Sequence, residues 1–319
     1  MSPEKTKIDE KFLEILSLHT AGSPVDEDIK WTNLTLNQIC EKMTEANAPV
    51  TRYQAKQLLK RHKFVRRTMR KSRTMKEVKN RNKQFIKIAK LRKEYEDAGD
   101  PIISIDSKKK EYIGDFYREG SFYGTVPQYV YDHDFNSFAD GVVIPHGIYD
   151  VRRNEGHITI GTSKDTSEFC CDNLEKWWLE IGKLHYPNAI RLLVLCDGGG
   201  SNSSRHYIFK EDLQKLSNKL GIKIRIAHYP PYTSKYNPIE HRMFCHVTRA
   251  CLGVVFSSVE IVKDLIAQTK TTTGLRVTVS INDKVYKTKR KYSKGFKENM
   301  KIRFDEVLGC WNYYAFPIP

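Results

Sequence analysis

Three acidic residues occupy positions that suit catalysis. Asp106 ends the apolar run Ile-Ile-Ser-Ile, and Asp197 ends the apolar run Leu-Leu-Val-Leu-Cys. Glu240 lies where a rigid loop runs into a helix that we expect to begin at Asn237 and Pro238. In α/β sheets, active sites gather at the carboxyl ends of strands and at the helix starts beside them. We therefore expect the three carboxylates to lie in one site.

Carboxylates gathered in this way suit phosphodiester chemistry. Cleavage or transfer of a phosphodiester requires an activated oxygen nucleophile and a stabilised leaving oxygen, and two Mg²⁺ ions about 4 Å apart provide both. Magnesium prefers hard oxygen ligands, so no histidine or cysteine cluster is needed. Glycines at 198–200 leave the backbone after Asp197 bare, which lets a bulky anionic substrate approach. We predict that Asp106, Asp197 and Glu240 hold two ions of Mg²⁺ or Mn²⁺.

Each acid also has a simpler interpretation. Asp106 and Asp197 fit ordinary strand-end residues that cap the following turn. The sequence Asn237-Pro-Ile-Glu240 also fits a helix N-cap, a proline at the first helical position and a capping-box glutamate. Only the conjunction of the three acids with the glycines and the basic charge favours catalysis over these alternatives.

The charge of the chain indicates a polyanionic partner. The sequence carries 54 Lys and Arg against 38 Asp and Glu, a net charge of +16. Between Thr51 and Lys93 there are 18 Lys or Arg and a single acid, Glu77, so this segment carries +17 and the rest of the chain is nearly neutral. Such a segment predicts contact with nucleic acid, and a solvated helix face is the alternative.

Other classes of protein are disfavoured by composition. No apolar run approaches the roughly 18 residues of a membrane span, and the charged first residues lack the apolar region of a secretory signal. The seven cysteines include no CxxC pair of the kind that zinc sites use, so we expect reduced thiols. We predict a cytoplasmic, DNA-associated protein that does not contact a membrane.

Residues 34–62 predict two helices joined by the turn Asn47-Ala-Pro-Val50. Thr51 suits the N-cap of the second helix. The pair has the form of a helix-turn-helix, whose second helix fits a major groove. Two helices of an ordinary bundle are the alternative. The residues that we expect to contact DNA are Arg52, Gln54, Lys56, Lys60 and Arg61.

A long helix is expected over residues 75–98, ending at Gly99-Asp-Pro101. Strands are then expected at 102–106, 157–162, 191–197 and 222–227, with helices over 165–184 and 207–220. This alternation predicts an α/β sheet that is partly parallel and covered by helices. A β-hairpin is expected from 275–279 and 284–287. The basic stretch 284–303 fits either a DNA contact or a solvated edge.

We predict a helical DNA-binding region at 1–74, a basic linker helix at 75–100 and a catalytic domain at 101–319.

Four runs carry a resemblance to a known family: Ile103–Glu111, Tyr131–Phe135, Leu193–Asn202 and His228–Arg242. They closely resemble the ISAzo-type insertion-sequence transposases, which are DDE enzymes distantly similar to the mariner group. The similarity extends from about Trp31 to Tyr313. The blocks Asp-Gly-Gly-Gly-Ser-Asn and Asn-Pro-Ile-Glu-His are the most specific parts of it.

The resemblance implies a ribonuclease-H-like mixed sheet in which Asp106, Asp197 and Glu240 bind two divalent metals. Such an enzyme cuts double-stranded DNA at transposon ends and joins the freed 3′-OH to target DNA. The resemblance also implies a homodimer on DNA. Lys235 is expected to contact phosphate. Four further residues lie in the matching motifs with roles left open: Asn202, His228, Asn237 and His241.

Two alternative functions remain at this point. One is a catalytically silent, transposase-derived protein that binds DNA, and the other is a ribonuclease-H-type nuclease without strand transfer. The N-terminal region is shorter than in such families, which predicts a shortened chain. The sequence leaves open the recognised DNA end and the target site.

Overall fold

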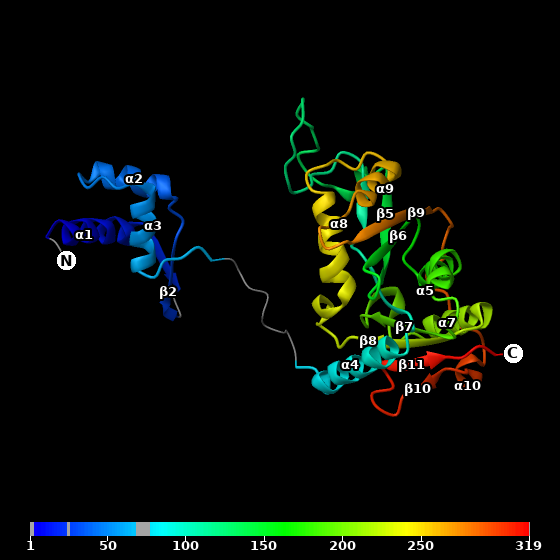
Figure 1. Ribbon diagram of the computed structural model, residues 1–319. Coiled ribbons are helices and arrows are strands. Elements are labelled where there is room, and N and C mark those ends of the chain that lie inside the picture. The colour runs from blue at the N-terminus through cyan, green and yellow to red at the C-terminus, as the bar shows by residue number, and fades with distance from the viewer. Residues whose placement is uncertain (1–2, 24–25, 68–76, 319) are drawn as a thin grey trace. The chain divides into compact units, whose positions relative to one another are not determined.

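The computed structural model describes residues 3–23, 26–67 and 77–318, apart from the side chains of 3–5, 22–23 and 26–29. The chain divides into two compact units, an N-terminal unit of Met1–Arg73 and a C-terminal unit of Thr74–Pro319 (Figure 1). Each unit has its own hydrophobic core.

The N-terminal unit contains three helices and a β-hairpin: α1 Pro3–Leu18, β1 Thr20–Ser23, β2 Asp26–Thr32, α2 Leu36–Glu45 and α3 Arg52–Arg61. Its core joins Phe12 of α1 to Ile39 and Met43 of α2 and to Ala55 and Leu58 of α3. The two helices predicted over residues 34–62 are confirmed. The helix α1 and the hairpin were not predicted.

Helices α2 and α3 begin with the same device. Thr35 accepts the backbone N–H of Gln38 and Thr51 accepts that of Gln54, and in each case the glutamine side chain accepts the N–H of the threonine. This capping box satisfies donors that have no partner within the helix. The predicted N-cap at Thr51 is confirmed.

The C-terminal unit is built on a nine-stranded mixed sheet in the order β10-β11-β8-β7-β3-β5-β6-β9, with β4 pairing to β5. Strands β3, β5 and β6 are antiparallel neighbours, whereas β7 and β8 run parallel to β3. This is the ribonuclease-H-like arrangement, so the predicted fold class is confirmed. The strands are β3 Ile102–Ser107, β4 Glu111–Ile113, β5 Gly141–Asp150, β6 Glu155–Gly161, β7 Arg191–Cys196, β8 Lys223–His228, β9 Arg276–Asn282, β10 Arg303–Phe304 and β11 Asn312–Ala315.

Helices cover both faces of the sheet (Figure 1). On one face, α5 and α7 pack against Ile103 and Ile105 of β3. On the other, α4 packs against Ile102, and α8 and α9 continue the cover over β5 and β6. The helices are α4 Arg81–Asp97, α5 Ser167–Trp177, α6 Lys183–His185, α7 Tyr207–Leu220, α8 Cys245–Ala250, α9 Val259–Ala267 and α10 Phe296–Asn299, with π-helical turns at Trp178–Gly182 and Glu240–Phe244.

The hairpin predicted near the C-terminus is wrong. Its first arm is β9, which pairs in parallel with β6 and so receives its hydrogen-bond partners from a strand far away in the sequence. The second arm, residues 284–287, is not a strand. Lys284 there forms ion pairs with Glu168 and Asp172 of α5. Periodicity alone did not distinguish a hairpin from a single strand followed by an anchored segment.

Two smaller expectations also changed. The long helix expected from residue 75 begins as α4 at Arg81, after Asn80 in a left-handed conformation, and residues 75–76 lie outside the described residues. This helix belongs to the same compact unit as the sheet. The strand β5 was not predicted, because Pro145 and Gly147 interrupt its apolar pattern with residues typical of turns.

All seven cysteines are free, as expected, and Cys170, Cys171 and Cys196 are buried. Within the described part of the chain, no helix has both the length and the apolar character that a membrane span requires.

Candidate active site

Asp106 and Asp197 stand at the ends of adjacent parallel strands. Strand β3 pairs with β7 in the register Ile102↔Leu193, so the carboxyl ends of both strands lie at one edge of the sheet. Asp106 lies at the end of β3 and Asp197 directly follows β7. Each carboxylate accepts a local backbone hydrogen bond, Asp106 from the N–H of Ser107 at 2.8 Å and Asp197 from the N–H of Gly199 at 3.2 Å.

Strand alternation directs Asp106 towards the helix that carries Glu240. Side chains alternate between the two faces of a strand, so Asp106 shares a face with Ile102 and Ser104. That face is covered by Ile239, whose backbone N–H donates to the Ser104 hydroxyl at 3.0 Å. Glu240 is the next residue, at the start of a π-helical turn. The strand bearing Asp106 and the helix bearing Glu240 are thus joined directly.

The side chain of Asn237 completes this junction. Its carbonyl oxygen accepts the Ser104 hydroxyl, and its NH₂ group donates to the carbonyl of Ile105 at 3.2 Å. Both Ser104 and Asn237 are fully buried. The interpretation of Asn237 as a side-chain cap for the helix is wrong, because its side chain bonds to β3 and only its backbone carbonyl accepts the N–H of Glu240.

A glycine allows the close approach of this helix. Gly147 on β5 is the cross-strand partner of Asp106. A Cβ atom at this position would lie 2.7 Å from Met243 and Phe244 and 2.8 Å from Ile239. Any larger residue at position 147 would therefore require the side chains of Met243, Phe244 and Ile239 to move.

The three carboxylates interact electrostatically. Burial raises the pKa of Asp106 to about 8, and the negative charges of Asp197 and Glu240 and a side-chain hydrogen bond with Glu240 act in the same direction. Burial also raises the pKa of Asp197, against the opposing effect of the Gly199 N–H. Like charges held near one another in a partly buried site are a feature of functional centres.

A fourth acid, Asp165, lies beside this group and was not predicted. The hydroxyl of Ser107, the residue after Asp106, donates to Asp165 at 3.3 Å. Asp165 is exposed, but desolvation by neighbouring groups raises its pKa, and the charge of Asp197 adds to this effect. Asp165 follows the carboxyl end of β6, which is parallel to β3, so the strand-end rule that selected Asp106 also points to it.

His228 supports the backbone of Asp197 from behind. Its Nδ1 lies 2.7 Å from the carbonyl oxygen of Asp197, and its Nε2 lies 2.9 Å from the hydroxyl of Tyr313. Burial lowers the pKa of His228 to about 4, so the ring is neutral at physiological pH. In a neutral ring one nitrogen donates and the other accepts, which fits Nδ1–H donating to Asp197 and Nε2 accepting from Tyr313. Asn202 is also buried, whereas His241 is exposed.

The donor chemistry of the site fits a hard divalent cation. Magnesium binds carboxylate oxygens and retains several waters, so a few acidic side chains suffice. Asp106, Asp197 and Glu240 supply such oxygens, and their mutual repulsion favours a positive ion among them. As the side chains stand in the described residues, no three Asp, Glu, His or Cys groups are close enough to hold an ion together.

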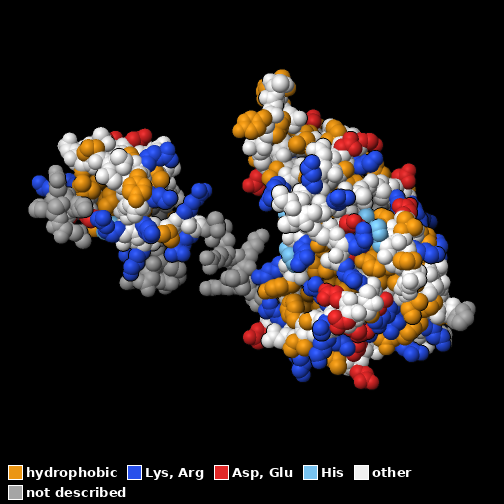
Figure 2. Space-filling model, viewed as in Figure 1, with side chains coloured by type: hydrophobic (Ala, Val, Ile, Leu, Met, Phe, Trp, Pro, Cys, Tyr) orange, Lys and Arg blue, Asp and Glu red, His pale blue; other side chains and the backbone are white. Residues whose placement is uncertain are grey.

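The predicted DNA-contact residues of α3 differ in their surroundings. Arg52, Lys56 and Lys60 are exposed, and Lys and Arg side chains lie on the visible surface of this unit (Figure 2). Gln54 is exposed but closes the capping box of α3. Arg61 forms an ion pair with Asp9 of α1, which reduces its availability for phosphate.

Lys235 lies in the C-terminal unit, five residues before Glu240. It is exposed, and its Nζ lies 5.2 Å from the ring centre of Tyr236.

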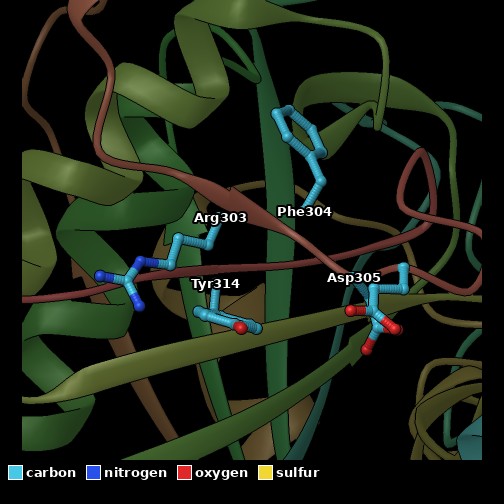
Figure 3. A pocket seen from close by; sticks show the side chains of 5 residues that line it. Arg303, Phe304, Asp305 and Tyr314 are labelled. Atoms are coloured by element: carbon cyan, nitrogen blue, oxygen red, sulfur yellow. The ribbon is translucent and has the colours of Figure 1, made fainter.

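A separate pocket lies along β10 and β11 and is lined by Arg303, Phe304, Asp305, Glu306 and Tyr314. Figure 3 shows Arg303 beside Tyr314, with Phe304 pointing away from both. Asp305 pairs with Lys87 and with Arg225 of β8, and these cations lower its pKa to about 2 against the effect of burial. None of the three candidate carboxylates lines this pocket.

One family model matches most of the chain. A family model described as the Rhodopirellula transposase DDE domain matches residues 11–317. No curated protein matches the chain. Among solved structures, the chain is similar to a pre-cleavage Mos1 transpososome (14% identity, TM-score 0.47, 80% of this chain and 69% of the other). It is also similar to a Mos1 transposase paired-end complex with the left transposon end (14% identity, TM-score 0.45, 80% and 68%).

Proposed function

Because the chain belongs to the family of transposase DDE domains whose model it matches over residues 11–317, we propose that it is a metal-dependent DNA transposase. The proposed reaction cleaves double-stranded DNA at transposon ends and transfers the freed 3′-OH into target DNA. The observation that supports this chemistry best is the partly buried carboxyl of Asp106, on which the charges of Asp197 and Glu240 act from two distant segments of the chain.

In this proposal Asp106, Asp197 and Glu240 hold two ions of Mg²⁺ or Mn²⁺. Such ions, when bound, activate the attacking oxygen and stabilise the leaving oxygen of a phosphodiester. The remaining groups position these carboxylates. Ser104 and Asn237 fix the Glu240 helix to β3, and His228 holds the backbone of Asp197.

The N-terminal unit is the proposed reader of DNA sequence. Helix α3 presents Arg52, Lys56 and Lys60 on one exposed surface, after a short turn from α2. In a helix-turn-helix the second helix enters the major groove and cations beside it contact phosphates. Transposition requires two DNA ends to be brought together, so we propose that the protein acts as a homodimer on DNA.

The experiment that tests the proposal combines the purified protein, Mg²⁺, a labelled DNA fragment from the sequence that flanks the coding region, and a supercoiled target plasmid. A transposase cuts the labelled fragment and joins its 3′ end to the plasmid. A nuclease of the ribonuclease-H type cuts the fragment without joining it. A catalytically silent DNA-binding protein retains the fragment uncut. The second and third outcomes would each replace the proposed function.

A further inference from the structure

The basic segment 284–303 begins at the same edge of the sheet as the candidate site. It follows β9, which is parallel to β6, and β6 is parallel to β3 because both are antiparallel to β5. The carboxyl ends of β3 and β9 therefore face the same way. The segment contains nine Lys or Arg residues and a single acid, Glu298.

Specific contacts anchor this segment along α5 and α7. Lys284 pairs with Glu168 at 3.0 Å and Asp172 at 2.7 Å. Arg290 pairs with Glu168 at 3.3 Å and also with Asp212 of α7. The backbone N–H of Ser293 donates to Glu211 at 2.9 Å. These bonds hold the segment against the N-terminal halves of both helices.

The same contacts connect the segment to the candidate site. Glu168 forms ion pairs with Lys284 and Arg290, and it lies three residues after Asp165. Asp165 bonds to Ser107, and the charge of Asp197 acts on it. The anchored cations therefore pair with a residue at the start of α5, three positions after Asp165. The start of α7 is held similarly, by packing of Tyr292 against Tyr207 with ring centres 5.6 Å apart.

The remaining lysines of the segment have no acidic partner. Six of them are exposed, and none forms an ion pair within the described residues: Lys287, Lys289, Lys291, Lys294, Lys297 and Lys301. In contrast to Lys284 and Arg290, they do not pair with acids of the fold, although Lys297 lies 5.3 Å from the ring centre of Tyr207. Exposed cations without acidic partners repel one another in the free protein and gain energy when they meet a polyanion.

We propose that these six lysines, hereafter the lysine ridge, bind the sugar-phosphate backbone of a DNA duplex that lies across the carboxylates. This inference rests on the proposed function, because it assigns to the C-terminal unit a binding surface for the DNA that is cut or joined. The ridge consists of point charges without a groove for base edges, so it contacts phosphates regardless of sequence. Its role is to hold the DNA beside the catalytic carboxylates.

The test measures the salt dependence of DNA binding in metal-free buffer. The full chain is titrated into a fluorescently labelled duplex of arbitrary sequence. The ridge variant carries Lys287→Gln, Lys291→Gln and Lys294→Gln. A matched control carries Lys176→Gln, Lys183→Gln and Lys219→Gln, which remove the same charge near the opposite ends of α5 and α7. A third variant replaces the three ridge lysines with Arg and keeps the charge.

Each phosphate contact contributes about 0.9 to the slope of log affinity against log salt. We expect the slope of the ridge variant to be shallower by about 2 to 3, the control to change by less than about 1, and the Arg variant to match the wild type. Equal slopes for the ridge variant and the control would overturn the ridge. The ridge would also be overturned if the slope became shallower in the ridge variant and stayed shallower in the Arg variant. That result would indicate damage to the fold rather than loss of charge.

The outcome is separable from that of the proposed chemistry. If the wild-type chain binds DNA through the ridge but neither cuts nor joins it, the ridge stands and the catalytic proposal fails. If the wild type cuts DNA and the ridge variant behaves like the control, the catalytic proposal stands and the ridge fails.

Discussion

At Asp106, burial and two neighbouring carboxylates act on one titratable group in the same direction. A fold gains nothing in stability from holding negative charges near each other, because each disfavours the ionised form of the next. Asp165 brings a further acid to the same edge. The unfavourable repulsion is understandable if a cation and a phosphodiester occupy the site during function.

The first prediction concerns Asp197. The change Asp197→Asn removes a charged ligand but preserves the shape of the side chain. We expect it to reduce Mg²⁺-dependent cleavage of end-containing DNA by at least about a hundredfold, in keeping with the loss of a charge-stabilising group, and to leave DNA affinity in metal-free buffer unchanged. Gel assays of cleavage and of binding measure the two effects. Asp132→Asn, on an exposed loop, is the matched control. Cleavage at the wild-type rate in Asp197→Asn would remove this residue from the site.

The second prediction concerns pH and stability. His146 on β5 is buried, and burial lowers its pKa from 6.5 to about 4. Its ring packs against Phe169. The unfolded chain binds a proton at pH 6.5 that the folded chain accepts only near pH 4, so stability is complete above pH 6.5 and is lost as pH falls towards 4.

The loss from His146 should reach about 3 kcal/mol at pH 4. Denaturant unfolding of wild type and His146→Leu at pH 7, 5.5 and 4.5 measures it. We expect the variant to lose less stability than the wild type over this range. A parallel decline in both proteins would show that His146 does not carry the effect.

At the scale of elements, the junction between β3 and the Glu240 helix positions the site. Asn237 donates to the carbonyl of Ile105 and accepts the Ser104 hydroxyl, and the N–H of Ile239 donates to that hydroxyl. Gly147 lets the helix lie close to the sheet. None of these residues needs to touch DNA. We propose that they are positioning residues, because they set where Glu240 stands relative to Asp106.

The third prediction removes one bond donor of that junction. Ser104→Ala leaves the N–H of Ile239 and the oxygen of Asn237 without their partner in a buried setting, which costs about 1–3 kcal/mol. We expect a lower unfolding temperature and a cleavage rate that falls further than the substrate affinity. Ser257→Ala, at an exposed position, controls for loss of a hydroxyl. An unchanged cleavage rate in a destabilised Ser104→Ala protein would separate stability from positioning and contradict the assigned role.

The fourth prediction concerns α3. Replacing Arg52, Lys56 and Lys60 with Ala should weaken DNA binding and flatten its salt dependence. The variant makes fewer phosphate contacts, so its binding releases fewer counterions from the DNA. The slope of log affinity against log salt should become shallower by about 2 to 3. The comparison is Lys7, Lys11 and Lys42 changed to Ala elsewhere in the same unit. If both triple variants retain the wild-type slope, the DNA footprint lies outside α3.

For the whole molecule, the sequence predicts best those elements whose local apolar pattern is sufficient to identify them without knowledge of their tertiary contacts. Strands β3, β7 and β8 are buried on both faces, so they appear as continuous apolar runs. Helix α7 was predicted with its observed bounds because its apolar spacing is unbroken. These elements were sufficient to predict the α/β class.

Other elements depend on partners that are remote in the sequence. Pro145 and Gly147 interrupt the apolar pattern of β5, so the sequence does not indicate a strand there. Gly147 accommodates the close approach of Met243 and Phe244, which the sequence does not reveal. The role of Asn237 depends on Ser104, a residue 133 positions away. Asp165 lacks a preceding run as apolar as those before Asp106 and Asp197. In each case the missing information is a tertiary contact.

The most direct test is anomalous diffraction from crystals of the full chain soaked in Mn²⁺, with Asp197→Asn crystals treated in the same way. We predict two anomalous peaks in the wild type, both within ligand distance of Asp106, Asp197 and Glu240, and their loss or weakening in the variant. Manganese bound only elsewhere on the molecule, or peaks of equal strength in both crystals, would contradict the assignment of these three residues as the metal site.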